Sequence, residues 1–182
     1  TLGQDTDTRR LSLENYMDME SVSNPQISPD GNQIIYARSW VDKLNDSRKS
    51  SLWIIDADGS RNRTLSEGSG ARWSPDGTRI AYTTEGDPRG SQIFVRWMDA
   101  EGAKSQITRL DNGPSNLRWS PDGQWIAFTS RVDDSADFAG VQLPSRPEGA
   151  DWTSEPKVVQ RAGYKRDRQG YIDTGWTHLF VV

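Results

Sequence analysis

One short phrase occurs three times in this chain at a constant spacing. Each copy reads Ser-Pro-Asp-Gly, at residues 28–31, 74–77 and 120–123. The spacing is 46 residues in both cases, since 74 − 28 = 46 and 120 − 74 = 46. A fixed period of roughly 20–50 residues is typical of repeat architectures. The chain is therefore built from repeated units, and its fold must place these phrases at equivalent points.

Each copy has the composition of a tight turn between two β-strands. Ser suits the first turn position, Pro presets the backbone at the second, Asp bonds nearby backbone at the third, and Gly takes the left-handed position that ends the turn. A large apolar residue precedes each phrase, and a β-rich run follows it. We interpret the following as structural turn residues: Ser28, Pro29, Asp30, Gly31, Ser74, Pro75, Asp76, Gly77, Ser120, Pro121, Asp122 and Gly123.

Four strands are expected in each complete unit. In the first unit, residues 25–66, one strand leads into the turn. Three runs rich in β-branched and aromatic residues follow it, at 34–36, 52–55 and 63–65. The second unit, residues 71–111, repeats this order. Four consecutive antiparallel strands per unit are typical of a β-propeller blade. The sequence thus predicts an all-β fold, a partial β-propeller of four-stranded antiparallel blades. A WD-repeat propeller is disfavoured because its Gly-His and Trp-Asp dipeptides are missing.

The third unit, residues 116–182, is interrupted by a long insertion. Matching aromatic residues stand 17 apart at Tyr36 and Trp53, 12 apart at Tyr82 and Phe94, but 52 apart at Phe128 and Phe180. An insertion at about 131–176 accounts for the difference, and we expect it to carry a hairpin of its own. The chain then encodes about two and a half blades, whereas a propeller ring needs about 4–8. We therefore expect part of a larger ring, and we expect self-association through exposed strand edges.

Residues 1–24 are expected to form a polar tail followed by a short helix. Leu13, Tyr16 and Met17 have helical spacing, and Ser12 precedes them as a capping residue. Asn24-Pro25 then ends any helix, because the residue before a proline avoids the helical region. An apolar stripe of this kind is usually a packing surface.

Composition excludes several classes of function. The net charge of −4 argues against nucleic acid as a partner. No apolar run approaches the roughly 18 residues of a membrane span. With no cysteine, the chain has no disulfides and no thiolate metal ligands. We predict no cofactor and no metal: the 56–59 segment reads as a hairpin turn rather than a calcium loop, and Asp133, Asp134 and Asp137 read as an exposed acidic loop.

The repeat phrase, with an aromatic residue before it and Ile-Ala-Tyr or Ile-Ala-Phe after it, resembles the repeat of TolB-type propellers. The same repeat occurs in the amino-terminal propeller of the prolyl oligopeptidase family of serine peptidases. Three further segments resemble acylaminoacyl-peptidase and dipeptidyl-peptidase members of that family. These segments are Leu11–Tyr16 with Val22–Gly31, Trp40–Asp46 leading to Ser51–Ile54, and Tyr164–Asp167 with Gly170-Tyr171 and His178–Val182.

This resemblance implies a parent serine peptidase whose propeller covers a C-terminal α/β-hydrolase domain and admits only short peptides. The chain itself lacks the Gly-x-Ser-x-Gly of such a hydrolase, and its one histidine, His178, is expected to be structural. We therefore predict no catalytic residue here, and a filtering and docking role for the propeller. Tyr164, Lys165 and Arg166 are candidates for contact with substrate or with the partner domain.

Two departures from the family pattern limit what the resemblance implies. No two glutamates are adjacent, as they are where well-known dipeptidyl peptidases hold a substrate amino terminus. In addition, Asp167-Arg168-Gln169 stands before Gly170-Tyr171, where the family often has Asp-Gly. The alternative is a TolB-like periplasmic interaction propeller without enzyme activity. A periplasmic or secreted location is expected, with a cytoplasmic one left open.

Overall fold

The protein is described by a computed structural model, which falls into two compact units. One unit comprises Thr1–Ser130 with Leu179–Val182, and the other comprises Arg131–His178. The structure describes residues 11–99, 101–133, 145–153, 159, 162–167, 170–172 and 175–182. Residues 1–10, the polar tail expected from the sequence, lie outside this range.

A single short helix, α1 (Leu13–Met17), precedes the strands in the described part of the chain. The Ser12 hydroxyl accepts a hydrogen bond from the Asn15 backbone N–H, and the Asn15 side chain accepts one from the Ser12 N–H. This reciprocal capping satisfies two N–H groups that a helix start leaves without partners. The helix begins directly after Ser12, as the sequence predicts, and ends at Met17, which Asp18 follows as the C-cap.

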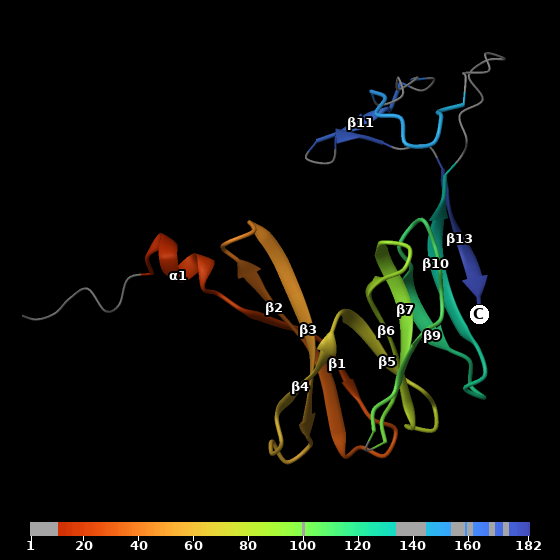
Figure 1. Ribbon diagram of the computed structural model, residues 1–182. Coiled ribbons are helices and arrows are strands. Elements are labelled where there is room, and N and C mark those ends of the chain that lie inside the picture. The colour runs from red at the N-terminus through yellow and green to blue at the C-terminus, as the bar shows by residue number, and fades with distance from the viewer. Residues whose placement is uncertain are drawn as a thin grey trace, which may run out of the picture. The chain divides into compact units, whose positions relative to one another are not determined.

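The first sheet has four antiparallel strands in chain order (Figure 1). They are β1 (Ser21–Ile27), β2 (Gln33–Asp42), β3 (Ser47–Asp56) and β4 (Arg63–Glu67). Strand β1 begins before residue 25, where the sequence placed the start of the first blade. The reason is that β2 is long enough to pair with Ser21–Ser23 as well. Pro25 does not interrupt this pairing because it lies within a bulge, where no ladder N–H is required.

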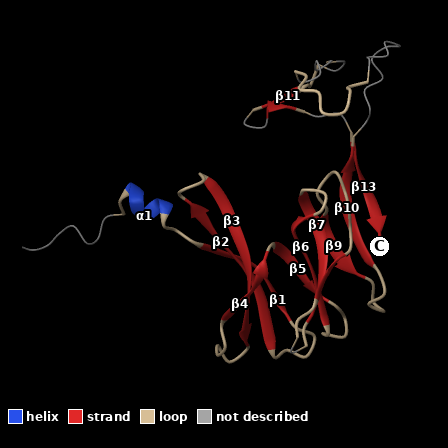
Figure 2. Cartoon of the chain, viewed as in Figure 1, coloured by secondary structure: helices blue, strands red, loops and turns tan. Residues whose placement is uncertain are grey.

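The second sheet repeats the four-stranded antiparallel order, and the third sheet has the order β13-β10-β9 (Figures 1 and 2). The second contains β5 (Ser69–Trp73), β6 (Arg79–Gly86), β7 (Gly90–Trp97) and β8 (Lys104–Gln106). The third contains β9 (Ser115–Trp119), β10 (Ile126–Val132) and β13 (Trp176–Val181). The structure confirms the predicted fold class: an all-β partial propeller. Residues 131–178 carry a hairpin of their own, β11 (Lys165–Arg166) with β12 (Gly170–Tyr171).

The aromatic pairs identified by spacing are cross-strand neighbours. Tyr36 lies opposite Trp53, and Tyr82 lies opposite Phe94. In the third sheet the rings of Phe128 and Phe180 stack with their centroids 5.5 Å apart. Strand β13 is therefore the equivalent of β3 and β7, although a long segment separates it from β10.

The apolar core consists of two clusters, each shared by two neighbouring sheets. Strand β6 contributes to both, because successive side chains of a strand point to opposite faces. Its Ile80 and Tyr82 pack with residues of the first sheet, and its Ala81 packs with residues of the third. The buried members are Ile35, Ala37, Leu52, Ile54, Ala71, Ile80 and Tyr82 in one cluster, and Ala81, Ile93, Val95, Leu117, Ile126 and Phe128 in the other.

Tryptophans just before the repeated turns join neighbouring sheets. The indole N–H of Trp73 donates to the Gln26 carbonyl at 3.1 Å, and that of Trp119 donates to the Arg72 carbonyl at 3.0 Å. Both rings also pack against the core clusters. The first strand of each sheet is thus fixed to the first strand of the preceding one, and β5 lies beside both β1 and β9.

Replacing Trp119 with Phe should destabilise the chain by about 1 kcal/mol, the usual net worth of one hydrogen bond, beyond any loss of packing. The measurement is the free energy of unfolding in urea. The matched control is Trp125→Phe, whose ring is 54% exposed, and we expect it to change stability by less than about 0.5 kcal/mol. Equal effects of the two substitutions would contradict a bridging role for the Trp119 indole.

Candidate functional site

The three repeated turns have the same backbone geometry. In each, the Gly N–H donates to the Ser carbonyl at 2.9 Å, which closes a four-residue turn. Gly31, Gly77 and Gly123 have φ of +77°, +71° and +68°. This left-handed conformation costs glycine little, and it explains why each phrase ends in glycine.

The serine hydroxyl and the aspartate carboxylate of each turn bond to each other and to the two residues that follow the turn. The Ser74 hydroxyl donates to Asp76 and accepts the Arg79 backbone N–H at 2.9 Å. The Asp76 carboxylate accepts the backbone N–H and the hydroxyl of Thr78. These donors, the Ser74 hydroxyl first, lower the pKa of Asp76 from 3.8 to about 2. The same serine bond lowers the pKa of Asp30 and of Asp122.

Successive turns also lie against one another. A Cβ placed on Gly77 would lie 3.5 Å from Pro29 Cδ, and one on Gly123 would lie 3.5 Å from Pro75 Cδ. Arg79 donates from Nη2 to the Gly123 carbonyl at 2.9 Å, and its guanidinium lies 5.0 Å from the Trp119 ring centroid. The polar groups of these turns are bonded to neighbouring protein atoms. The turns therefore join successive sheets and have little hydrogen-bonding capacity left for a ligand.

A second repeated feature, which the sequence analysis missed, lies on the first strand of each sheet. Asn24, Gly70 and Asn116 have φ of +50°, +67° and +56°, and they also recur every 46 residues. Around each of them the register with the second strand shifts, so that two residues oppose one aromatic residue: Tyr36, Tyr82 or Phe128. Such a bulge redirects the side chains that follow it.

The residue two positions after each left-handed residue is a hydrogen-bond donor. Gln26, Arg72 and Arg118 each donate to the carbonyl of the residue immediately before them, at 2.8, 2.7 and 2.8 Å. These three residues lie on β1, β5 and β9, which are the first strands of the three sheets in chain order and are neighbours. We call the three residues the inner row. Burial, and then the positive charge of Arg118, lower the pKa of the Arg72 guanidinium. A period-46 comparison of the residues before Ile27, Trp73 and Trp119 would have revealed the row.

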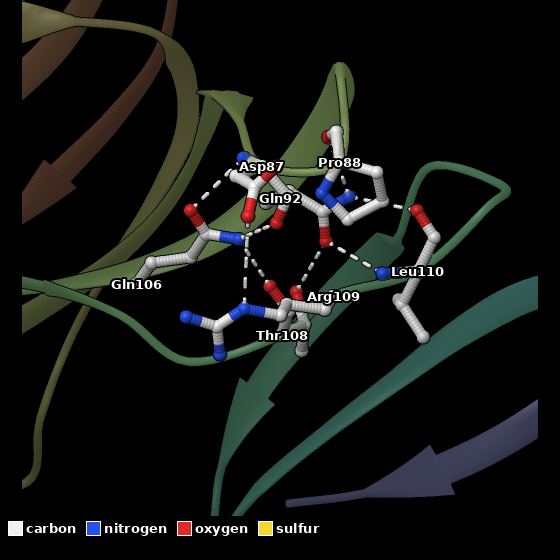
Figure 3. A network of polar contacts seen from close by, with 7 residues as sticks. All are labelled: Asp87, Pro88, Gln92, Gln106, Thr108, Arg109 and Leu110. Atoms are coloured by element: carbon white, nitrogen blue, oxygen red, sulfur yellow. Dashed lines mark hydrogen bonds and ion pairs between the residues drawn. The ribbon is translucent and has the colours of Figure 1, made fainter.

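A buried amide network fixes the connection between the second and third sheets (Figure 3). The fully buried Gln92 side chain donates to the Leu110 carbonyl at 2.7 Å and accepts the Leu110 N–H at 2.9 Å and the Thr108 hydroxyl at 3.0 Å. Gln106 binds both the N–H and the carbonyl of Asp87. Every side-chain amide atom here has a protein partner, so the network is structural.

The candidate contact residues Tyr164, Lys165 and Arg166 lie on or beside the β11–β12 hairpin. The Tyr164 ring lies 6.1 Å from the Tyr171 ring, and the Lys165 ammonium lies 5.0 Å from the Tyr171 centroid. Arg166 is exposed opposite Gly170. The structure therefore brings Tyr164 and Lys165 together on the ring of Tyr171.

The remaining polar candidates are occupied by local contacts or lie outside the described range. Asp56 pairs with Arg61 and accepts a hydrogen bond from Gln33, as a turn residue does. Asp133 pairs with Arg131 at 3.1 Å, and Asp134 and Asp137 lie outside the described residues. His178 is exposed on β13. Within the described ranges no group of three acidic or histidine side chains is arranged to hold a metal ion, and no helix is long and apolar enough to cross a membrane.

The sequence is similar to parts of two peptidases. The chain is 30% identical over 167 residues to the uncharacterized peptidase YuxL of Bacillus subtilis (strain 168), covering 89% of this chain and 24% of that protein. It is 28% identical over 116 residues to dipeptidyl-peptidase 5 of Porphyromonas endodontalis, covering 60% of this chain and 16% of that protein. The chain thus spans about a quarter or less of each relative. No family model matches it.

Solved structures agree on the fold. An acylaminoacyl peptidase of Pyrococcus horikoshii superposes with a TM-score of 0.62 at 18% identity, covering 92% of this chain and 23% of that one. The β-propeller domain of a trilobed protease from Pyrococcus furiosus gives a TM-score of 0.51 at 18% identity, covering 63% of this chain and 39% of that one.

The lowered pKa of Asp76 predicts an acid-dependent loss of stability. Its pKa is lower in the folded chain than the ordinary 3.8. Its contribution to the free energy of unfolding is therefore present above about pH 4 and is lost as pH falls towards about 2. Urea unfolding measured across this interval should weaken less steeply for Asp76→Asn than for the parent chain. Asp111→Asn removes the same charge outside the turns and should keep the parent's slope; a matching slope for Asp76→Asn would refute the assignment.

Proposed function

We propose that this chain is a non-catalytic propeller portion of a serine peptidase of the prolyl oligopeptidase family. The observation that carries the proposal is the similarity to a peptidase along most of the chain, together with three repeat sheets of which the second packs against both the first and the third. The proposed partner is a C-terminal α/β-hydrolase domain, which would supply the catalytic serine in a Gly-x-Ser-x-Gly turn.

The proposed role is to filter and dock short peptides for that domain. Propeller sheets are arranged radially about a central channel. A channel of this kind admits an extended peptide but not a folded protein, because the sheets around it are close-packed and do not yield. A periplasmic or secreted location stays a prediction.

Binding to the isotope-labelled chain tests the docking role directly. A short unstructured peptide should shift backbone amide resonances of the first strands β1, β5 and β9. A folded protein that carries the same peptide sequence on its surface is the comparison. A chain that responds to neither form would contradict the docking role, and a response to the folded form alone would favour the alternative, an interaction propeller that recognises folded partners.

Chemical labelling tests the non-catalytic assignment. The chain should not react with a serine-directed fluorophosphonate, since it has no Gly-x-Ser-x-Gly and His178 lies exposed on a strand. An active serine peptidase of the same family, labelled in parallel, is the positive control. Stoichiometric labelling of this chain would contradict the proposal.

We also propose that this chain self-associates through β13. Leu179 and Val181 of β13 are 73% and 59% exposed. The equivalent residues of the second sheet, Ile93 and Val95, are 0% and 4% exposed because the third sheet covers them. Strand β13 is also the edge strand of its sheet in the described structure, which leaves backbone groups available for pairing.

Sedimentation over a concentration series checks this association. Leu179→Lys should weaken it by about tenfold or more, because burying a leucine side chain contributes about 1.5–3 kcal/mol. The control is Leu44→Lys, in the turn between β2 and β3, where the leucine is 91% exposed. A parent chain that stays monomeric at all concentrations, or an equal effect of both substitutions, would exclude self-association through β13.

A further inference from the structure

We propose that Arg72 and Arg118 of the inner row form a binding site for a peptide carboxylate. The inference rests on the proposed function, because it names the chemical group by which the docked peptides are recognised. The carboxylate is either the free carboxyl terminus of a peptide or an acidic side chain within it.

Backbone geometry places the two guanidinium groups in equivalent positions on neighbouring strands. Each arginine follows a bulge with a left-handed residue, Gly70 or Asn116. Each donates one bond from Nη1 to the carbonyl of its preceding residue. The strands that carry them, β5 and β9, lie side by side. The fold therefore presents two cations in the same orientation, one on each strand.

The hydrogen-bonding capacity of both groups is largely unused within the described structure. A guanidinium carries five N–H donors in a planar fork, and the printed contact of each arginine uses one of its nitrogens. Neither arginine forms an ion pair with a described carboxylate, whereas Arg38, Arg61, Arg89, Arg109 and Arg131 each do. A carboxylate fits such a fork through two parallel charge-assisted hydrogen bonds.

Electrostatics favour an anion at this place. Arg72 is partly buried, so its charge is less well solvated than that of a surface arginine. The charge of Arg118 adds repulsion, and both effects lower the pKa of Arg72. An anion between the two groups would relieve both costs. The net charge of −4 on the chain as a whole disfavours polyanions. A single carboxylate suits the guanidinium fork without that disadvantage.

The first sheet provides a natural reference for this position. Gln26 occupies it there and makes the same contact with its preceding carbonyl, without any charge. Replacing either arginine with glutamine therefore keeps a residue that this fold already accepts at the equivalent point. The double variant Arg72→Gln/Arg118→Gln removes the two charges and retains the local hydrogen bond.

Three acetylated alanine peptides test the proposal on the 182-residue chain by calorimetry and by nuclear magnetic resonance of the arginine Nε–H groups. The first has a free carboxyl terminus, the second is its uncharged carboxyl-terminal amide, and the third is an amide that contains one glutamate. We expect the free acid, the glutamate peptide or both to bind and the uncharged amide not to bind. In the double variant, binding should weaken by about tenfold or more, as expected for losing hydrogen bonds to charged groups.

The control variant is Arg63→Gln/Lys104→Gln, which removes two positive charges from the exposed outer strands β4 and β8. It should bind as the parent does, which separates a local site from overall charge. The double variant Arg72→Lys/Arg118→Lys should bind weakly, since it keeps the two charges but not the planar fork of donors. Urea midpoints establish that each variant is folded.

The outcomes separate this inference from the function on which it rests. If the free acid binds the double variant and the parent equally, the arginine site is refuted while peptide docking stands. If no peptide binds the parent chain, both are refuted. Comparison of the free acid with the glutamate peptide identifies the source of the carboxylate: a terminus, a side chain, or either one.

Discussion

The packing of one sheet's face against the next is the interaction on which the rest of this structure depends. A thin four-stranded sheet buries its apolar residues only when a neighbour stands on each face, and the second sheet shows this condition met on both sides. Its strand β6 sends Ile80 to one cluster and Ala81 to the other. A modest apolar content of 33% is sufficient, because each side chain serves an interface between two sheets rather than one large central core.

The period of 46 residues follows from that packing. The indole of Trp119 donates to the Arg72 carbonyl, and Arg79 donates to the Gly123 carbonyl. Both hydrogen bonds require that equivalent residues of successive sheets lie side by side. Insertions are therefore accepted between β10 and β13, where the chain leaves the packed sheet, and not within the turns or the first strands. The stacking of Phe128 on Phe180 shows that the third sheet keeps its register across such an insertion.

Most of the fold could be predicted from the sequence, because its determinants are local and repeated. The turns require proline and glycine at fixed positions, and the aromatic partners mark the second and third strands, including β13. The early start of β1 could not be predicted, since it depends on how far β2 extends beside it. The bulges were missed for a different reason: Asn24, Gly70 and Asn116 share a backbone conformation but not a residue type. A repeat in φ is visible only in the structure.

Two kinds of repeated position can be distinguished on this basis. At 28, 74 and 120 both the geometry and the residue are constant, because the serine hydroxyl has two bonds to make within every turn. At 26, 72 and 118 the geometry is constant while the residue changes from an uncharged amide to a guanidinium. The fold needs only a donor there, and glutamine suffices. A positive charge at two of the three positions exceeds what the fold requires, and its cost is visible in the lowered pKa of Arg72. Excess charge at a geometrically fixed point is what a recognition site requires, and this distinguishes the inner row from the turns that hold the sheets together.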